Sequence, residues 1–305
     1  MRSFRIVFTA LFVCAAALLT GCQTAEFALN YQPGEVDTFK VSQETTKEVS
    51  FEQPSKEKSK LDRNVGRVEM VFDQKVDSLK PDGTAILDIT VKELVFFSKN
   101  SKGVNVDFNS KEDESGTLAS IIGESYKISM AADGTVEVVD KEDIMKKCRT
   151  REAKTIFKDD YIIKRHTIRG IPKPGTTVAK GKSWDRYSAS PKGALDSKAF
   201  RKTYEVEKMQ DGIAHIEMTG SQTNKEIEGL DVGSGSMGFM ANIFDTKDTF
   251  TGSMVYNTET GEVVKSSESL VSEHVAMEQP KGGDTKKGPD VLTMRFIHKY
   301  SFEKI

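Results

Sequence analysis

The sequence lacks the residue patterns that usually mark catalysis or metal binding. Its four histidines, His166, His215, His274 and His298, are isolated, so none has the H-x-H or H-x₃-H spacing of a metal site. There is no serine in a G-x-S-x-G turn and no G-K-[ST] phosphate loop. We therefore predict a protein that is not an enzyme and holds no cofactor or metal. An unrecognised enzyme stays open as an alternative.

The sequence also lacks an excess of charge of one sign. Its 44 Lys and Arg residues face 46 Asp and Glu residues, which gives a net charge of −2. Nucleic-acid binding depends on a basic excess that neutralises phosphates. We therefore expect no nucleic-acid partner.

One glycine-rich pattern is present, but its flanking segments are not those of a dinucleotide site. Residues Gly233–Gly238 spell G-x-G-x-x-G. A dinucleotide site needs this turn between a strand and a helix of a parallel unit. The flanking segments are typical of hairpins, so we interpret the pattern as a flexible loop.

The first 21 residues contain the one long apolar run. Arg2 and Arg5 precede an apolar core, Ile6–Leu19, of about 14 residues, which is too short to span the roughly 30 Å of a bilayer as a helix. Such an order is typical of a secretory signal peptide. The residues Leu19-Thr20-Gly21-Cys22 then resemble the lipobox of bacterial lipoproteins. This resemblance implies that residues 1–21 are removed and that Cys22 is acylated.

Acylation of Cys22 would place the protein at a membrane. Two or more acyl chains anchor a protein stably, and residues 22–30 would form a short lipidated tether. Gln23 follows the cysteine, as in enterobacterial lipoproteins sorted to the outer membrane. We therefore expect a membrane-anchored lipoprotein of the outer membrane that faces the periplasm.

Cysteine is scarce, with only three residues in the chain. Cys14 would leave with the signal peptide and Cys22 would be acylated. Only Cys148 would remain, which excludes an intramolecular disulfide. We interpret Cys148 as a small buried residue, with intermolecular pairing as the alternative.

Alternation of apolar and polar residues dominates the rest of the chain and predicts antiparallel strands. Four hairpins are expected, each with turn residues between its strands. They span residues 68–91, 126–140, 200–220 and 252–273. A last strand should carry Leu292, Met294, Phe296, His298, Tyr300 and Phe302 on one face.

The hairpins fall into two halves of similar plan, residues 31–139 and 172–305, related by a weak repeat of about 110 residues. Residues 140–171 between them have helical periodicity, with Asp140 as a candidate N-cap and Gly170 and Pro172 as stops. Two segments, 53–63 and 279–289, are predicted to be exposed loops. The fold class we predict is mainly β (α+β), with two similar curved antiparallel sheets joined by a mid-chain helix.

This arrangement resembles an uncharacterised family of secreted bacterial lipoproteins with two β-rich halves. The entry to the second half carries the residues of that resemblance, Pro174, Val178, Gly181 and Trp184. The resemblance spans roughly residues 29 to 277 and implies no activity. In architecture alone, the chain also resembles the periplasmic lipoprotein carriers, in which a curved sheet holds acyl chains.

Methionines on the apolar face of strands indicate a possible ligand-binding surface, because their side chains adapt to irregular partners. The loop that contains Met237, Phe239 and Met240 either packs in the core or closes as an apolar flap. The candidate ligand-binding residues are Met70, Phe72, Met218, Met237, Phe239, Met240, Met294, Phe296 and His298.

Two functions remain open for this candidate surface. A lipid-anchored envelope protein could bind a hydrophobic ligand or acyl chain in a cavity that these residues line. Alternatively, the same residues fill a closed core, and the protein acts by contacting another envelope protein. A void between the side chains would favour the first function, and close packing would favour the second.

Overall fold

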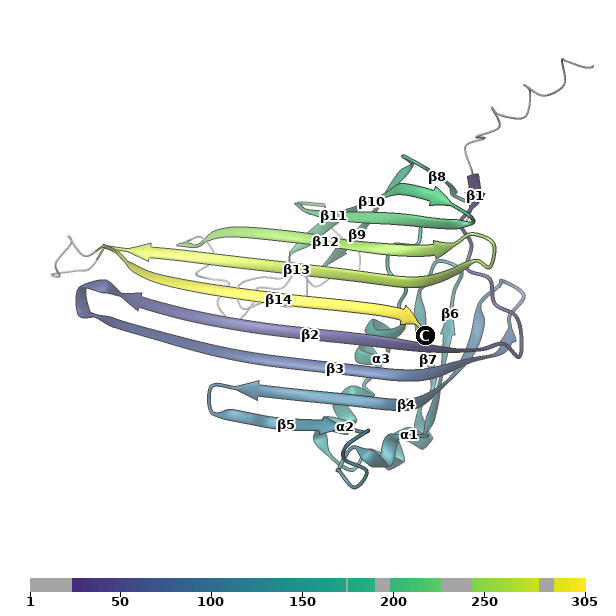
Figure 1. Ribbon diagram of the computed structural model, residues 1–305, viewed down its shortest axis with the longest axis horizontal. Helices are drawn as coiled ribbons and strands as arrows, with labels where there is room; N and C mark the ends of the chain where they lie inside the picture. Colours follow the sequence, from purple (N-terminus) through teal and green to yellow (C-terminus); the bar gives the residue numbers. More distant parts are fainter. Residues whose placement is uncertain (1–23, 174, 190–197, 226–242, 280–287) are drawn as a thin grey trace, which may run out of the picture.

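The computed structural model describes residues 24–173, 175–189, 198–225, 243–279 and 288–305 (Figure 1). The signal-peptide segment and Cys22 therefore lie outside the described residues. The helices are α1 Glu142–Lys147, α2 Arg151–Ile156, α3 Asp159–His166, and the 3₁₀ turns η1 Pro54–Lys56 and η2 Ala119–Ile121. The strands are β1 Thr24–Glu26, β2 Val36–Gln53, β3 Lys58–Leu79, β4 Ala85–Asn100, β5 Gly103–Asn109, β6 Ser125–Met130, β7 Val136–Asp140, β8 Thr177–Ala179, β9 Ser183–Ala189, β10 Ala199–Gln210, β11 Ile213–Thr223, β12 Asp245–Asn257, β13 Glu262–Glu278 and β14 Asp290–Lys304.

Twelve of these strands form one antiparallel sheet, so the mainly β prediction is confirmed. Their order is β7-β6-β4-β3-β2-β14-β13-β12-β11-β10-β9, and β5 pairs with β4. The structure therefore has one continuous sheet in place of the two similar sheets that the sequence predicts. The halves merge because β14 pairs with β2 from Val291–Glu52 to Lys304–Phe39. This pairing satisfies the backbone groups of two strands that would otherwise be exposed edges.

The four predicted hairpins are confirmed. They correspond to β3–β4, β6–β7, β10–β11 and β12–β13. Each turn contains a glycine with a positive φ angle, a conformation that side chains with a Cβ rarely adopt. These glycines are Gly83, Gly134, Gly212 and Gly261.

The prediction of an exposed loop at residues 53–63 is wrong. In the structure β2 continues to Gln53, only Pro54–Lys56 turn, and β3 starts at Lys58. Most side chains of this hairpin tip are exposed on both faces. Period-2 alternation arises only where one face is buried, so the sequence pattern did not reveal these strand ends.

The expected tether at residues 22–30 is also shorter than predicted. β1 pairs with β8 in a separate two-stranded sheet. Phe27 follows β1 and is buried, with its ring stacked 3.9 Å from the ring of Tyr256. The Tyr256 hydroxyl also donates to the carbonyl of Ala28 at 2.8 Å. The chain is thus fixed to the sheet from β1 onward.

The predicted mid-chain helix is divided into α1, α2 and α3. The first break has a clear cause, because the Thr150 side chain accepts a hydrogen bond from the backbone N–H of Ala153 and starts α2. The predicted N-cap Asp140 instead ends β7, and Lys141 is the N-cap of α1. The Asp140 carboxylate accepts from the N–H of Glu142 at 3.0 Å. No helix in the described part of the chain is long and apolar enough to cross a membrane.

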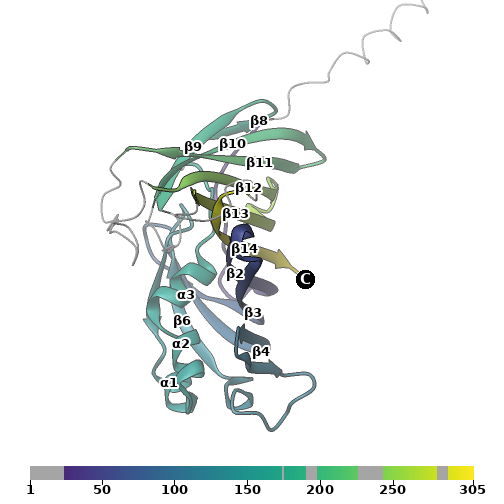
Figure 2. The same cartoon turned by 90° about the vertical axis from the view of Figure 1, so that its left-hand side faces the viewer.

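The three helices lie against one face of the sheet, which curves around them (Figure 2). We call this the inner face. Ile144, Ile156, Phe157 and Ile162 of the helical segment are buried and join strand residues in one large core. Cys148 belongs to the same core and is buried, as the sequence predicts. Burial in the core raises the pKa of this thiol.

The helical layer contains a buried charged side chain, Arg165 of α3. The Arg165 side chain is 2% exposed, and no carboxylate pairs with it in the described residues. It donates to the carbonyl of Ile156 at 2.7 Å and to the hydroxyl of Tyr126 at 3.3 Å. Because the phenol oxygen accepts from Arg165, its own hydrogen is available for Nε2 of His166, 2.5 Å away. Burial, reinforced by the charge of Arg165, holds the pKa of His166 well below its ordinary value.

We predict that His166 makes the protein less stable when the pH falls from about 7 to 5. The unfolded state takes up a proton near pH 6.5, whereas the folded state keeps His166 neutral, so acid favours unfolding. The loss should be roughly 1 to 2 kcal/mol. Urea unfolding at both pH values measures it.

The variant His166→Gln should show a shallower pH dependence than the wild type, whatever its absolute stability. His215 is exposed on the opposite face of the sheet, so His215→Gln serves as the control and should keep the wild-type dependence. An unchanged pH dependence in His166→Gln would contradict the prediction.

Candidate functional site

The candidate residues from the sequence divide between two places. Met70, Phe72 and Met218 lie in the main core, with exposed fractions of 2% or less. Met294 and Phe296 belong to a separate, smaller cluster. The structure therefore does not bring these five side chains together along one cavity. The candidates Met237, Phe239 and Met240 lie outside the described residues.

The smaller cluster lies on the inner face of the long strands, farther from the helices. Figure 1 shows that β12, β13, β14, β2 and β3 extend well beyond the helical layer. We call the cluster the distal strip. It consists of Val49, Phe244, Ala276, Leu292, Met294 and Phe296.

Strand register explains why the distal strip is continuous. Leu292 lies between Ala276 on β13 and Phe51 on β2, and Met294 lies beside Val49. Phe244 directly precedes β12, at the end of the segment predicted either to pack in the core or to close as an apolar flap. Phe51 remains 39% exposed, and Leu292 and Val49 are half-buried. The strip and its neighbours thus have apolar surface that is not buried in the main core.

Polar side chains border the strip on the same face. His298 follows Phe296 by two residues, lies 3.4 Å from the Thr45 hydroxyl, and has its pKa lowered by burial. The Lys47 ammonium lies 5.5 Å from the centre of the Phe296 ring. Asp248 pairs with Lys198 at 2.7 Å.

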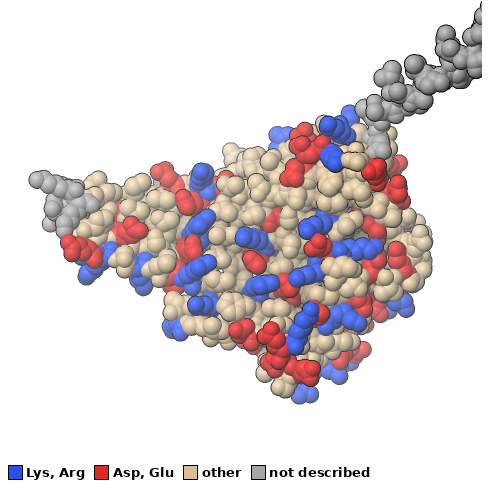
Figure 3. Space-filling view, viewed as in Figure 1, with Lys and Arg blue, Asp and Glu red and all other residues tan. Residues whose placement is uncertain are grey.

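A second candidate surface is a hollow on the outer face of the sheet. Its volume is about 580 Å³. Ser253, Ser267, Ser301 and Ser42 pair in register across β12, β13, β14 and β2, so their small side chains form a line across its floor. Lysine, arginine and acidic residues are interspersed over this face (Figure 3). Because it is lined by hydroxyls and charges, the hollow does not suit an acyl chain.

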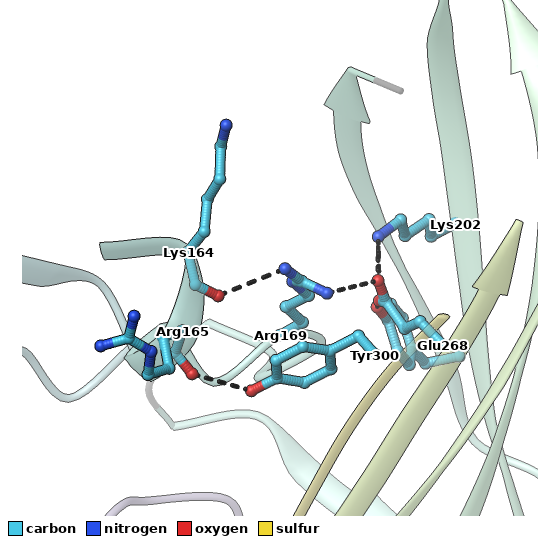
Figure 4. Close-up of polar contacts among 7 residues, drawn as sticks. Lys164, Arg165, Arg169, Lys202, Glu268 and Tyr300 are labelled. Atoms are coloured by element: carbon cyan, nitrogen blue, oxygen red, sulfur yellow. Dashed lines mark hydrogen bonds and ion pairs between the residues drawn. The ribbon is translucent and has the colours of Figure 1, made fainter. Parts of the chain in front are cut away.

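An ion-pair cluster lies where the helical layer ends, between that layer and the sheet (Figure 4). Lys202 on β10 is 5% exposed, and its ammonium lies 2.9 Å from both carboxylate oxygens of Glu268 on β13. The Tyr204 hydroxyl donates to the same carboxylate at 3.1 Å, and Arg169 donates to it at 3.4 Å. We call these four residues the Glu268 cluster.

The charges around Glu268 keep its carboxylate ionised. Burial alone would raise the pKa of Glu268, but the charges of Lys202 and Arg169 and the hydrogen bonds that it accepts bring it below its ordinary value. Burial lowers the pKa of Lys202, and Glu268 opposes that effect. The Lys202 ammonium also lies 4.4 Å from the centre of the Phe250 ring. Glu268 is therefore an ionised acceptor inside the protein.

Further side chains of the sheet hold the segment that leads out of α3. The Tyr300 hydroxyl donates to the carbonyl of Arg165 at 3.2 Å, and the Trp184 indole N–H donates to the carbonyl of Gly170 at 2.8 Å. Gly170 has a φ of +85°, and a Cβ there would collide with the ring of Tyr204. Only glycine allows this close approach of backbone and ring.

Among the described residues, one group of carboxylates has the geometry of a metal site. Oxygen atoms of Glu35, Asp37 and Glu262 lie within 4.8 Å of one another. The Lys304 ammonium is 2.8 Å from Asp37 and 2.7 Å from Glu262. Lys304 therefore supplies the positive charge that these carboxylates need.

Sequence reasoning missed Arg169, Lys202 and Glu268. A signal was present for Lys202, which alternates with Phe200, Tyr204 and Val206 and so lies on the buried face of β10. A charged residue at such a position must find a partner inside the protein. The identity of that partner depends on strand order, which the alternation does not contain.

Comparisons with known proteins identify no family. No protein-family model matches the chain, and no curated protein matches it. Among solved structures, the chain is similar to one described as lipid-protein interactions in lipovitellin, with 9% identity and a TM-score of 0.45. The match covers 90% of this chain and 25% of the lipovitellin chain, so this chain spans about a quarter of that protein's length. Similarity at this level says nothing about the ligand.

We predict that Glu268→Gln destabilises the protein by about 3 kcal/mol, because Lys202 would remain buried without an opposite charge. Chemical unfolding at neutral pH measures the change. Glu303→Gln is the matched control. Glu303 pairs with Lys265 at 3.1 Å, but its side chain is 47% exposed, so the loss should be below about 1 kcal/mol. Equal losses in the two variants would contradict a special role for the buried cluster.

Proposed function

We propose that this protein is a lipid-anchored protein of the cell envelope that binds a hydrophobic ligand or acyl chain on the distal strip. The observation that carries the proposal is an apolar cluster on the inner face, separate from the core, with partly exposed neighbours. Phe244, Met294 and Phe296 are themselves buried, and the cluster reaches the surface through its half-buried members Val49, Ala276 and Leu292 and through the neighbouring Phe51. Apolar surface beside a cluster of this kind is typical of ligand and protein contacts. Met294, Phe296 and His298 remain in the proposed site, whereas Met70, Phe72 and Met218 serve the core.

The anchor in this proposal is Cys22, within the lipobox-like residues Leu19–Cys22. A thioether-linked diacylglycerol with an acylated amine would hold the protein at a bilayer. Outer-membrane location, on the periplasmic side, is part of the same proposal and is supported by Gln23.

A second function is favoured by the packing of the other candidates. Met70, Phe72 and Met218 fill a closed core, and the hollow of about 580 Å³ on the outer face is polar. A protein that contacts another envelope component through its outer face would have both features. Ligand binding requires the distal strip to accept an apolar molecule, whereas the interaction function does not.

The proposed ligand site is tested with the neutral apolar dye Nile red and delipidated protein. We expect the dye to bind, and we expect Leu292→Asp to weaken binding about tenfold, because a carboxylate replaces apolar area in the strip. Val104→Asp is the control, since Val104 is 56% exposed on β5, outside the strip. Equal binding by the wild type and Leu292→Asp, or no binding at all, would favour the interaction function.

The proposed anchor predicts that the native product carries fatty acid at Cys22. In a bacterial host, radiolabelled palmitate should label the wild type and fail to label Cys22→Ala. Intact-mass measurement should show a chain that starts at residue 22 with its acyl groups. A processed chain with a free thiol at Cys22, or an uncleaved one, would reject the anchor without affecting the distal strip.

A further inference from the structure

On β14 the distal strip is apolar from Leu292 to Phe296, and different charges lie toward its two ends. On β13 the buried His274 lies beside Met294 and packs against the rings of Phe244 and Phe296. Along β14 it begins at Leu292, continues to Phe296, and is followed on the same face by His298 and Tyr300. Arg169 lies over Tyr300, with its guanidinium carbon 4.0 Å from the centre of the ring. This cation of the segment following α3 therefore lies beyond the Phe296 end of the strip, four residues farther along β14. The Lys47 ammonium adds a second positive charge at the same end, 5.5 Å from the centre of the Phe296 ring.

The guanidinium of Arg169 has unused capacity for hydrogen bonds. Its side chain is 28% exposed. It donates to Glu268 at 3.4 Å and to the carbonyl of Lys164 at 3.3 Å, and both distances are long for such bonds. Two of its five donors are engaged in this way. Within the Glu268 cluster, moreover, Arg169 and Lys202 together face one carboxylate, which leaves a net positive charge.

Acids border the strip at its middle, level with Met294, and at its Leu292 end. Asp62 lies across from Val49, and Asp290 lies two residues before Leu292. Each has one buried carboxylate oxygen without a hydrogen-bond partner in the described part of the chain. The side chain of Lys60 at this end is exposed. A negatively charged group is therefore better placed at the Arg169 end.

The dimensions agree with a single acyl chain. At about 3.3 Å per residue, the distance from Leu292 to Phe296 is about 13 Å. One acyl chain spans half of a bilayer core of about 30 Å, which is about 15 Å. A chain that lay on the strip would place its polar head beside His298, two residues or about 7 Å along β14 from Tyr300, the residue over which Arg169 lies.

We infer that the ligand of the distal strip is an anionic amphiphile with one acyl chain, such as an ionised fatty acid, and that Arg169 binds its carboxylate. This inference rests on the proposed function and adds the class of ligand. Arginine and carboxylate groups match in geometry and form charge-assisted hydrogen bonds. His298, whose pKa burial lowers, would offer a neutral imidazole next to the first carbons of the chain.

The test compares palmitate and hexadecanol, which have the same chain length, as competitors for bound Nile red at about pH 8. We expect palmitate to bind about tenfold more tightly than the alcohol to the wild type. Arg169→Gln should lower the affinity for palmitate to that for hexadecanol, and Arg169→Lys should keep part of the difference. Thermal unfolding and displacement by hexadecanol show whether the variant is folded with an intact strip.

Each outcome decides one of the two proposals. Equal displacement by palmitate and hexadecanol in the wild type overturns the inference but leaves the proposed function in place. A palmitate advantage that persists in Arg169→Gln also overturns it. If the dye does not bind and neither compound binds, the proposed function itself fails. Should Arg169→Gln not fold, the wild-type comparison still decides whether the ligand is anionic.

Discussion

A buried ion pair between Lys202 on β10 and Glu268 on β13 determines how the two layers of this protein meet. Arg169 joins the same carboxylate from the segment after α3, and Tyr300 donates to the end of α3. These contacts fix where the helical layer stops. On one side of that border the inner face is covered and forms the core; on the other side it carries the distal strip.

The strands and turns of this fold are predictable from the sequence because their causes are local. Alternation predicted the face of β14 that carries Met294, Phe296, Tyr300 and Phe302, and all four are buried. Strand order has no such local cause. Nothing in the alternation of β2 or β14 identifies the other as its neighbour, so the sequence predicted two sheets where the pairing of these strands makes one.

The candidate site was only partly predictable for the same reason. Phe72 and Phe296 both lie at apolar positions of alternating strands, yet one belongs to the core and the other to the distal strip. The difference comes from the helical layer, which covers the inner face only as far as Arg169. Within that layer Thr150 divides α1 from α2, and the periodicity did not reveal this capping role.

The position of β14 has a consequence for how the chain is made. This strand is the last in the sequence, yet it lies in the middle of the sheet, between β2 and β13. Until it has been synthesised, both of those strands keep an open edge that can pair with other chains. Non-local pairing of this kind also slows folding. A nascent chain that lacks residues 290–304 is therefore prone to aggregate, and a chaperone that shields strand edges would be of most use at this stage of its biogenesis.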